Sequence, residues 1–325
     1  MLDGEPLNAL SRNDQSPADL PDASGVGAGA ILAIANPVAG SASKLDLAAL
    51  DARLRETIGV RFGGMTIAAP DAMEATLKAM VASRPAAIVV VGGDGTARSA
   101  AKAAMAGGGD TAIVPLPAGT MNILPRLVFG HADLDRAVTE LADMKPATLP
   151  AGFVGGEPFF LSAAFGFAAS LARLRETMRP PRKWPEVAAA AGACARASLH
   201  SLRGGPHYRT DGARWRRAHT LVVAVGSVAR VTAPDAAPAD VDTLEVAALH
   251  LRSGIDALRV GGVALTSGWR TSRHMRVLSA RAVEVRMRSH RPMVVLDGEP
   301  VRVSRVDAVT FKARAVPILA PADRA

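Results

Sequence analysis

Hydrophobic and polar positions follow a regular alternation along the first half of the chain. Residues 30–35, 87–91 and 112–117 are apolar runs with the length and composition of buried parallel strands. Between them, residues 45–58 carry apolar side chains at helical spacing, and the Ala-rich segment 97–105 has high helix propensity. Strands that alternate with helices in this way predict an α/β fold, a doubly wound parallel sheet with its ligands at the carboxyl ends of the strands.

The pattern changes after about residue 148, where strand-like runs dominate and several of them alternate polar with apolar residues. This favours an antiparallel β-sandwich. The runs cover residues 159–161, 220–225, 244–249, 283–287, 293–296 and 308–311. Two helical inserts are predicted at 168–202 and 255–266. We therefore expect a disordered polar tail at 1–28, an α/β domain at 29–148 and a β-sandwich domain at 149–325.

A glycine-rich turn, Gly92–Thr96, joins the second of these strands to the Ala-rich helix. Its glycines allow close approach of a ligand, and the N–H groups of the following helix favour an anion such as a phosphate. Asp94 within the turn would repel phosphates unless it holds a metal ion or accepts a hydrogen bond. The alternative is a tight strand-to-helix connection with an Asp cap and no ligand.

Two further polar loops follow predicted strands. Thr120 and Asn122 bring a hydroxyl and an amide to the loop after residue 117, and Asn36 brings an amide to the loop after residue 35. Phosphate oxygens and ribose hydroxyls are bound by such donors. A proline-rich turn that caps a helix would have the same composition as the loop after residue 117, so both interpretations stay open for that loop alone, and Asn36 alone is a weak signal.

The amino-acid composition favours some classes of binding partner and argues against others. The net charge of +8 favours an anionic partner, but only 4% of the residues are aromatic, which argues against nucleic acid. The single cysteine, Cys194, excludes a disulfide framework. The polar, acidic start resembles no signal peptide, and no apolar run has the roughly 18 residues that span a bilayer. We expect a cytoplasmic protein whose contact with the inner face of a membrane is at most peripheral.

Four motifs in order resemble the diacylglycerol kinase catalytic-domain family, which includes bacterial lipid kinases and sphingosine and ceramide kinases. They are Asn-Pro-Val-Ala-Gly at 36–40, Gly-Gly-Asp-Gly-Thr at 92–96, Gly-Thr-Met-Asn at 119–122 and Leu-Asp-Gly-Glu-Pro at 296–300. The resemblance implies an N-terminal half like that of phosphofructokinase and NAD kinase, with ATP and Mg²⁺ in the cleft beside the β-sandwich. It also implies transfer of the γ-phosphoryl group of ATP to a hydroxyl of a lipid substrate at the membrane surface.

The same resemblance assigns roles to residues. Glu299 becomes the proton acceptor, and Asp94 a catalytic carboxylate linked to the metal or to the acceptor hydroxyl. The nucleotide-binding positions are Asn36, Thr66, Gly92, Gly93, Asp94, Gly95, Thr96, Gly119, Thr120 and Asn122. Without the family, the Asp-Gly pair before Glu299 is typical of a β-turn with two solvated acids.

The chain departs from the family pattern in places. A motif at 240–245 that holds a structural Mg²⁺ in the family carries Val241 and Asp242 at altered positions, so no second metal is expected. A basic segment at 173–203 with Trp184 is a candidate for docking on anionic lipid, or is a solvated helix face.

Two other functions stay open: an NAD-kinase-like or sugar-phosphate kinase, and a non-catalytic pseudokinase that binds lipid or nucleotide. The sequence leaves the acceptor lipid and the oligomeric state open.

Overall fold

A computed structural model describes residues 29–166, 169, 205–226, 243–250, 275–289, 291–303 and 308–324. Four features predicted from the sequence lie outside these residues. They are the tail at 1–28, both helical inserts apart from residue 169, the basic segment at 173–203 and positions 240–242 of the altered metal motif.

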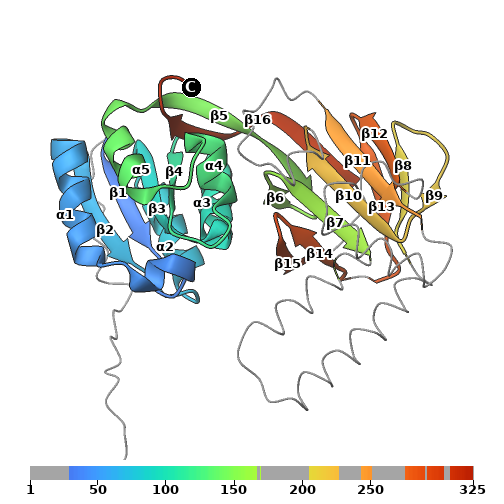
Figure 1. The fold of residues 1–325 in the computed structure, drawn as a ribbon, viewed down its shortest axis with the longest axis horizontal. Helices are drawn as coiled ribbons and strands as arrows, with labels where there is room; N and C mark the ends of the chain where they lie inside the picture. The colour runs from blue at the N-terminus through green and yellow to red at the C-terminus, as the bar shows by residue number, and fades with distance from the viewer. Residues whose placement is uncertain are drawn as a thin grey trace, which may run out of the picture.

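The N-terminal half is an α/β unit, as predicted (Figure 1). Its parallel strands lie in the order β2-β1-β3-β4. The elements are β1 (Ile31–Ala35), α1 (Leu47–Ile58), β2 (Phe62–Ile67), α2 (Met73–Ala82), β3 (Ala87–Gly92), α3 (Asp94–Ala106), β4 (Ala112–Pro117), α4 (Ile123–Phe129) and α5 (Leu134–Glu140), with short 3₁₀ turns at Gly40–Lys44, Gly59–Arg61 and Leu141–Asp143.

Helices cover both faces of this parallel sheet. All residues of β1, β3 and β4 are buried, which is why their sequences are continuously apolar. Crossover connections between parallel strands are right-handed, so α1 lies on the face opposite to α2 and α3. Contacts between α1 and α5, and between α2 and α3, agree with this arrangement. The sheet is therefore doubly wound, with its loops gathered at the carboxyl edge.

The second half is antiparallel, also as predicted. Its strands are β5 (Lys145–Val154), β6 (Glu157–Phe159), β7 (Ser162–Gly166), β8 (His207–Thr210), β9 (Arg216–Arg217), β10 (Thr220–Val225), β11 (Leu244–Leu249), β12 (Met275–Ala280), β13 (Val283–Arg286), β14 (Met293–Leu296), β15 (Glu299–Arg302) and β16 (Ala308–Ala320). One sheet runs β12-β11-β10-β7-β14-β15, and it packs on β13, β8 and parts of β5 and β16 around a second apolar core.

Two long strands, β5 and β16, join the halves (Figure 1). In β16, Val309 pairs with β13 of the antiparallel half, whereas Ile318 pairs in parallel with Ile113 of β4. The main sheet therefore continues from the parallel half into the antiparallel half. The boundary predicted at residue 148 falls inside β5, whose residues contribute to both apolar cores. That boundary stays a prediction.

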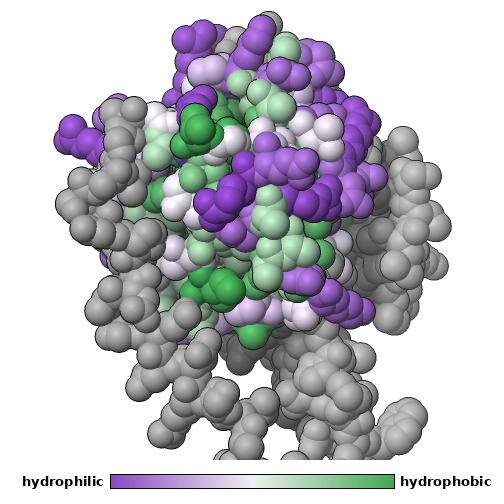
Figure 2. All heavy atoms as spheres, turned by 90° about the vertical axis from the view of Figure 1, so that its left-hand side faces the viewer, coloured by the Kyte–Doolittle hydropathy of each residue, from purple (hydrophilic) through white to green (hydrophobic). Residues whose placement is uncertain are grey.

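The described surface mixes polar and apolar residues. Figure 2 shows this for the face that lies on the left in Figure 1. Large hydrophobic residues are exposed at four described positions, Val38, Val60, Ile67 and Met121. None of the helices in the described part of the chain is long and apolar enough to cross a membrane.

Candidate functional site

Three loops meet at the carboxyl edge of the parallel sheet, where the sequence predicted a ligand. A Cβ atom on Gly119 would lie 2.8 Å from the Cα atom of Gly93, and one on Gly40 would lie 3.1 Å from the Cα atom of Gly119. The backbone N–H of Ala42 also donates to the carbonyl of Ala118, at 3.0 Å. The loops after β1, β3 and β4 therefore touch backbone to backbone, which only glycine allows at these positions.

Asp94 begins α3, yet it caps a different helix. Its Oδ1 accepts hydrogen bonds from the backbone N–H groups of Ile123, at 2.6 Å, and Leu124, at 3.2 Å. These are orphan donors at the start of α4, while the cap position of α3 itself is Gly93. Burial raises the pKa of the Asp94 carboxyl, against the lowering effect of both N–H groups, and the neighbouring Glu299 raises it further. Asp94 thus fixes the loop before α4 against the start of α3.

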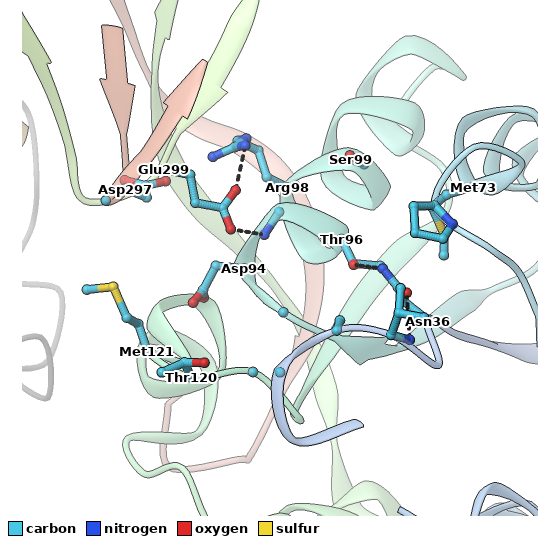
Figure 3. Close-up of a pocket in the computed structure, with 18 of the residues that line it drawn as sticks. Asn36, Met73, Asp94, Thr96, Arg98, Ser99, Thr120, Met121, Asp297 and Glu299 are labelled. Carbon is cyan, nitrogen blue, oxygen red and sulfur yellow. Dashed lines mark hydrogen bonds and ion pairs between the residues drawn. The ribbon is translucent and has the colours of Figure 1, made fainter. Parts of the chain in front are cut away.

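Asn36 attaches the first loop to α3. Its Nδ2 donates to Oγ1 of Thr96 at 3.1 Å, and its Oδ1 accepts from the backbone N–H of Val38 at 3.2 Å. Both Asn36 and Thr96 are buried, so their polar groups satisfy each other (Figure 3). This pair shapes the wall of the site.

Asn122 holds the third loop closed. Its Oδ1 accepts a hydrogen bond from the backbone N–H of Gly119 at 2.7 Å, and its φ of 53° lies in the left-handed region that asparagine tolerates. The two residues enclosed by this bond, Thr120 and Met121, are exposed. They line a cavity, described below, whereas Asn122 does not.

The antiparallel half contributes a hairpin, β14–β15, through the two-residue turn Asp297-Gly298. Both turn residues have positive φ, 51° and 88°, as the type I′ turn favoured by Asp-Gly requires. The carboxylate of Asp297 is buried and accepts from the N–H groups of Phe160, Leu161 and Ser162 at 2.7–2.9 Å.

Burial raises the pKa of Asp297 to about 6, opposed by those three N–H groups and by Arg98. The structure therefore confirms the turn that the Asp-Gly pair favours. The expectation of two solvated acids is wrong for Asp297, because the loop at 160–162 presents donors that a buried carboxylate can accept.

Glu299, at the start of β15, reaches across to α3. Its Oε1 accepts from the backbone N–H of Gly95 at 3.2 Å, and its Oε2 from Nη2 of Arg98 at 2.9 Å (Figure 3). Nη1 of Arg98 also donates to the carbonyl of Leu296 at 3.1 Å. Arg98 was not among the site residues predicted from the sequence. A signal was available, since Arg98 follows Asp94 by four residues and so shares its face of the helix.

These groups surround a cavity of about 820 Å³, a size typical of small-molecule sites. It is lined by Asn36, Val38, Ala39, Gly40, Pro70, Met73, Glu74, Gly93, Asp94, Gly95, Thr96, Arg98, Ser99, Gly119, Thr120, Met121, Val295, Asp297, Gly298 and Glu299. Most of the predicted site residues are thus brought together.

Three predicted nucleotide-binding residues do not line the cavity. Asn122 closes the loop described above. Gly92 ends β3, where a Cβ atom would collide with the side chain of Thr96 at 2.8 Å. Thr66 lies in β2, paired with Ile34 of β1. On that side, residues at the start of α2 form the wall instead. The nucleotide contacts assigned to these three residues stay predictions.

The lining can accommodate a metal together with a ligand, but it does not preassemble a metal site. The described residues contain no cluster of three or more His, Cys, Asp or Glu side chains that could hold a metal ion. Four carboxylates line the cavity, and among the described lining residues Arg98 alone carries positive charge. A polyphosphate would meet net repulsion there, so a divalent cation bound with it is needed to balance the charge.

Comparisons with known proteins agree with the fold described above. Three solved structures from Bacillus anthracis str. Sterne share the fold over 91% of this chain. One, a diacylglycerol kinase, is 13% identical, with 98% of its chain covered and a TM-score of 0.60. The other two, provisionally named diacylglycerol kinases, are 16% and 15% identical, with 96% and 98% covered and TM-scores of 0.63. Residues 30–153 match the family model of the diacylglycerol kinase catalytic domain.

Proposed function

We propose that the protein is an ATP-dependent lipid kinase that transfers the γ-phosphoryl group of ATP to a lipid hydroxyl. One observation carries the proposal. Glu299, from the antiparallel half, lies against the first turn of α3 in a cavity formed by the three glycine-containing loops. A carboxylate and a phosphate-binding helix terminus in one cavity are the parts that phosphoryl transfer to an alcohol requires.

The phosphates of ATP fit the start of α3. The N–H groups of its first turn and the helix dipole both favour negative charge. The glycines at 93 and 119 leave the backbone accessible there. When bound, Mg²⁺ would supply charge neutralisation and orient the phosphates, and Asp94 is the carboxylate best placed to contact it.

Side chains of the protein itself then bind the lipid acceptor and take the proton of its hydroxyl group. As the acceptor oxygen forms its bond to the γ-phosphorus, the bond from that phosphorus to the β-bridging oxygen breaks, ADP leaves, and the hydroxyl proton passes to Glu299. Two of the large exposed hydrophobic residues, Val38 and Met121, line the cavity and offer apolar contacts for the lipid. Diacylglycerol, ceramide, a sphingoid base or a related lipid alcohol would suit this site.

The lipid would be taken from a membrane surface by peripheral contact, in keeping with a cytoplasmic protein at the inner face. The basic segment at 173–203 remains our candidate for that contact, and liposome sedimentation with and without anionic lipid tests it. Equal sedimentation with both kinds of liposome would exclude electrostatic docking.

The decisive experiment incubates the purified protein with γ-labelled ATP, Mg²⁺ and separate acceptors: diacylglycerol, ceramide, sphingosine, NAD and sugar phosphates. We expect label in one lipid, and its loss in Asp94→Asn and Glu299→Gln variants. Label in NAD or a sugar phosphate would indicate the related kinase activities instead. Nucleotide binding with no transfer to any acceptor would indicate a pseudokinase.

A further inference from the structure

Arg98 connects the two halves of the site through both ends of its guanidinium group. Nη2 pairs with Oε2 of Glu299 at 2.9 Å, and Nη1 donates to the carbonyl of Leu296 at 3.1 Å. The side chain of Arg98 is only 12% exposed, whereas that of Glu299 is 42% exposed. The more buried partner therefore holds the more exposed one.

The two groups that Arg98 holds lie on either side of one turn. Leu296 ends β14 and Glu299 begins β15, and these residues pair with each other across the hairpin. Asp297 between them is anchored on the opposite side by the loop at 160–162. Arg98 thus clamps the hairpin to α3 from the cavity side, and the planar fork of a guanidinium suits two acceptors in different directions.

From this geometry we propose that Arg98 is a positioning residue that fixes the carboxylate of Glu299 for proton acceptance. The inference rests on the proposed kinase function and goes beyond it, because it assigns a role to a residue outside the motifs that carry the family resemblance. A glutamate side chain rotates about three bonds, and Arg98 together with the N–H of Gly95 restricts it to one place at the start of α3. Without Arg98, the carboxylate samples positions from which it cannot reach the acceptor proton.

The first test is kinetic and uses Arg98→Gln and Arg98→Lys. We expect Arg98→Gln to lower kcat by about 100-fold while the KM for ATP stays close to that of the wild type, since the loss concerns the chemical step. Arg98→Lys should recover part of the loss, because an ammonium can pair with Glu299 but cannot also reach Leu296. Free guanidinium ion should partly rescue Arg98→Ala. In a Glu299→Gln background, Arg98→Gln should cost little more, because the two residues act together.

A matched control is available on the same helix. Lys102 pairs with Glu157 of β6 at 2.5 Å, so it also joins α3 to the antiparallel half, but it does not line the cavity. Lys102→Met removes an ion pair between the same two halves and should leave kcat unchanged. A matching loss of activity in Lys102→Met and Arg98→Gln would show that Arg98 acts only by joining the halves, and would overturn the proposal.

The second test does not depend on turnover. With ¹³C-carboxyl-labelled glutamate, the Glu299 signal is identified in NMR spectra as the one missing from Glu299→Gln. We expect it to shift in Arg98→Gln and to stay in place in Lys102→Met. An unshifted signal, or full activity of Arg98→Gln, overturns the positioning role and leaves the kinase function standing. A wild-type protein inactive on every acceptor overturns the kinase function, and the proposed role of Arg98 with it.

Discussion

Each side of the cavity carries a buried aspartate that accepts hydrogen bonds from the backbone of another segment. Asp94 receives them from the start of α4, the next helix along the chain, whereas Asp297 receives them from the loop at 160–162, far away in sequence. Both aspartates adjoin glycines and both follow a buried strand. Their oxygens nevertheless hold the framework together, and Glu299 is the acid whose carboxylate reaches the start of α3. The hydrogen-bond partners of an acidic side chain, more than the sequence motif that contains it, indicate which role the side chain can have.

Among these acidic residues, we expect the largest effect on catalysis from the substitution Glu299→Gln. Glutamine keeps the shape but cannot accept the proton, so we expect kcat to fall by about 100-fold or more. The urea midpoint should stay close to that of the wild type, because Glu299 is partly exposed. An active Glu299→Gln enzyme would assign proton acceptance to another group.

For Asp297 we instead expect an effect on the free energy of unfolding and on how that free energy depends on pH. Its pKa rises from 3.8 to about 6 on folding, so the folded protein binds the proton more tightly than the unfolded chain does. This stabilisation is complete below about pH 4 and is lost as the pH rises through 6, a change worth about 3 kcal/mol.

Urea titrations at pH 4.5 and 7.5 measure about 2 kcal/mol of this change, because about 1 kcal/mol is already lost at pH 4.5. Asp297→Asn should flatten the dependence of stability on pH between these values, since asparagine does not titrate. The amide nitrogen of asparagine cannot accept the bond from Phe160, a loss that offsets part of what the variant gains at pH 7.5 by burying no charge. The same pH dependence in both proteins would mean that another group is responsible.

The contact among the three loops predicts a smaller effect for Gly119→Ala. The new Cβ atom would lie 2.8 Å from the Cα atom of Gly93, so the loops must separate, at a cost of about 1–3 kcal/mol. Nucleotide affinity, measured by calorimetry, should weaken as well. Gly93→Ala is the matched control for stability: its Cβ atom would meet only that of Ala39, at 3.9 Å, and we expect a loss under about 1 kcal/mol. Equal losses would contradict the close approach.

The smallest effect is expected from Thr96→Val, which removes the acceptor for Asn36 in a buried place. The loss in stability should be about 1 kcal/mol. Thr76→Val, which removes an exposed hydroxyl bond within α2, should cost about 0.5 kcal/mol or less. Thermal unfolding of the two variants compares them directly, and equal shifts would argue against a buried Asn36–Thr96 pair.

Much of the parallel half could be predicted because its signals are local. The apolar runs at 30–35, 87–91 and 112–117 all became buried strands, since a strand covered on both faces has no polar positions. The path of β16 was not predictable in this way. Its alternating residues pair with β13 at one end and with β4 at the other, and pairing between distant strands leaves no local pattern.

The sequence by itself determined the class of the two halves, the three polar loops at one sheet edge and the Asp-Gly hairpin turn, because periodicity, strand ends and turn residues act over a few neighbouring positions. Only the tertiary structure decided which contacts each of the three acidic side chains makes. The burial of Asp297, the cap that Asp94 forms on α4 and the pairing of Glu299 with Arg98 all join residues from different elements. Such contacts depend on how the chain packs, since the environment that a carboxylate meets is set by whichever donors the fold brings to it.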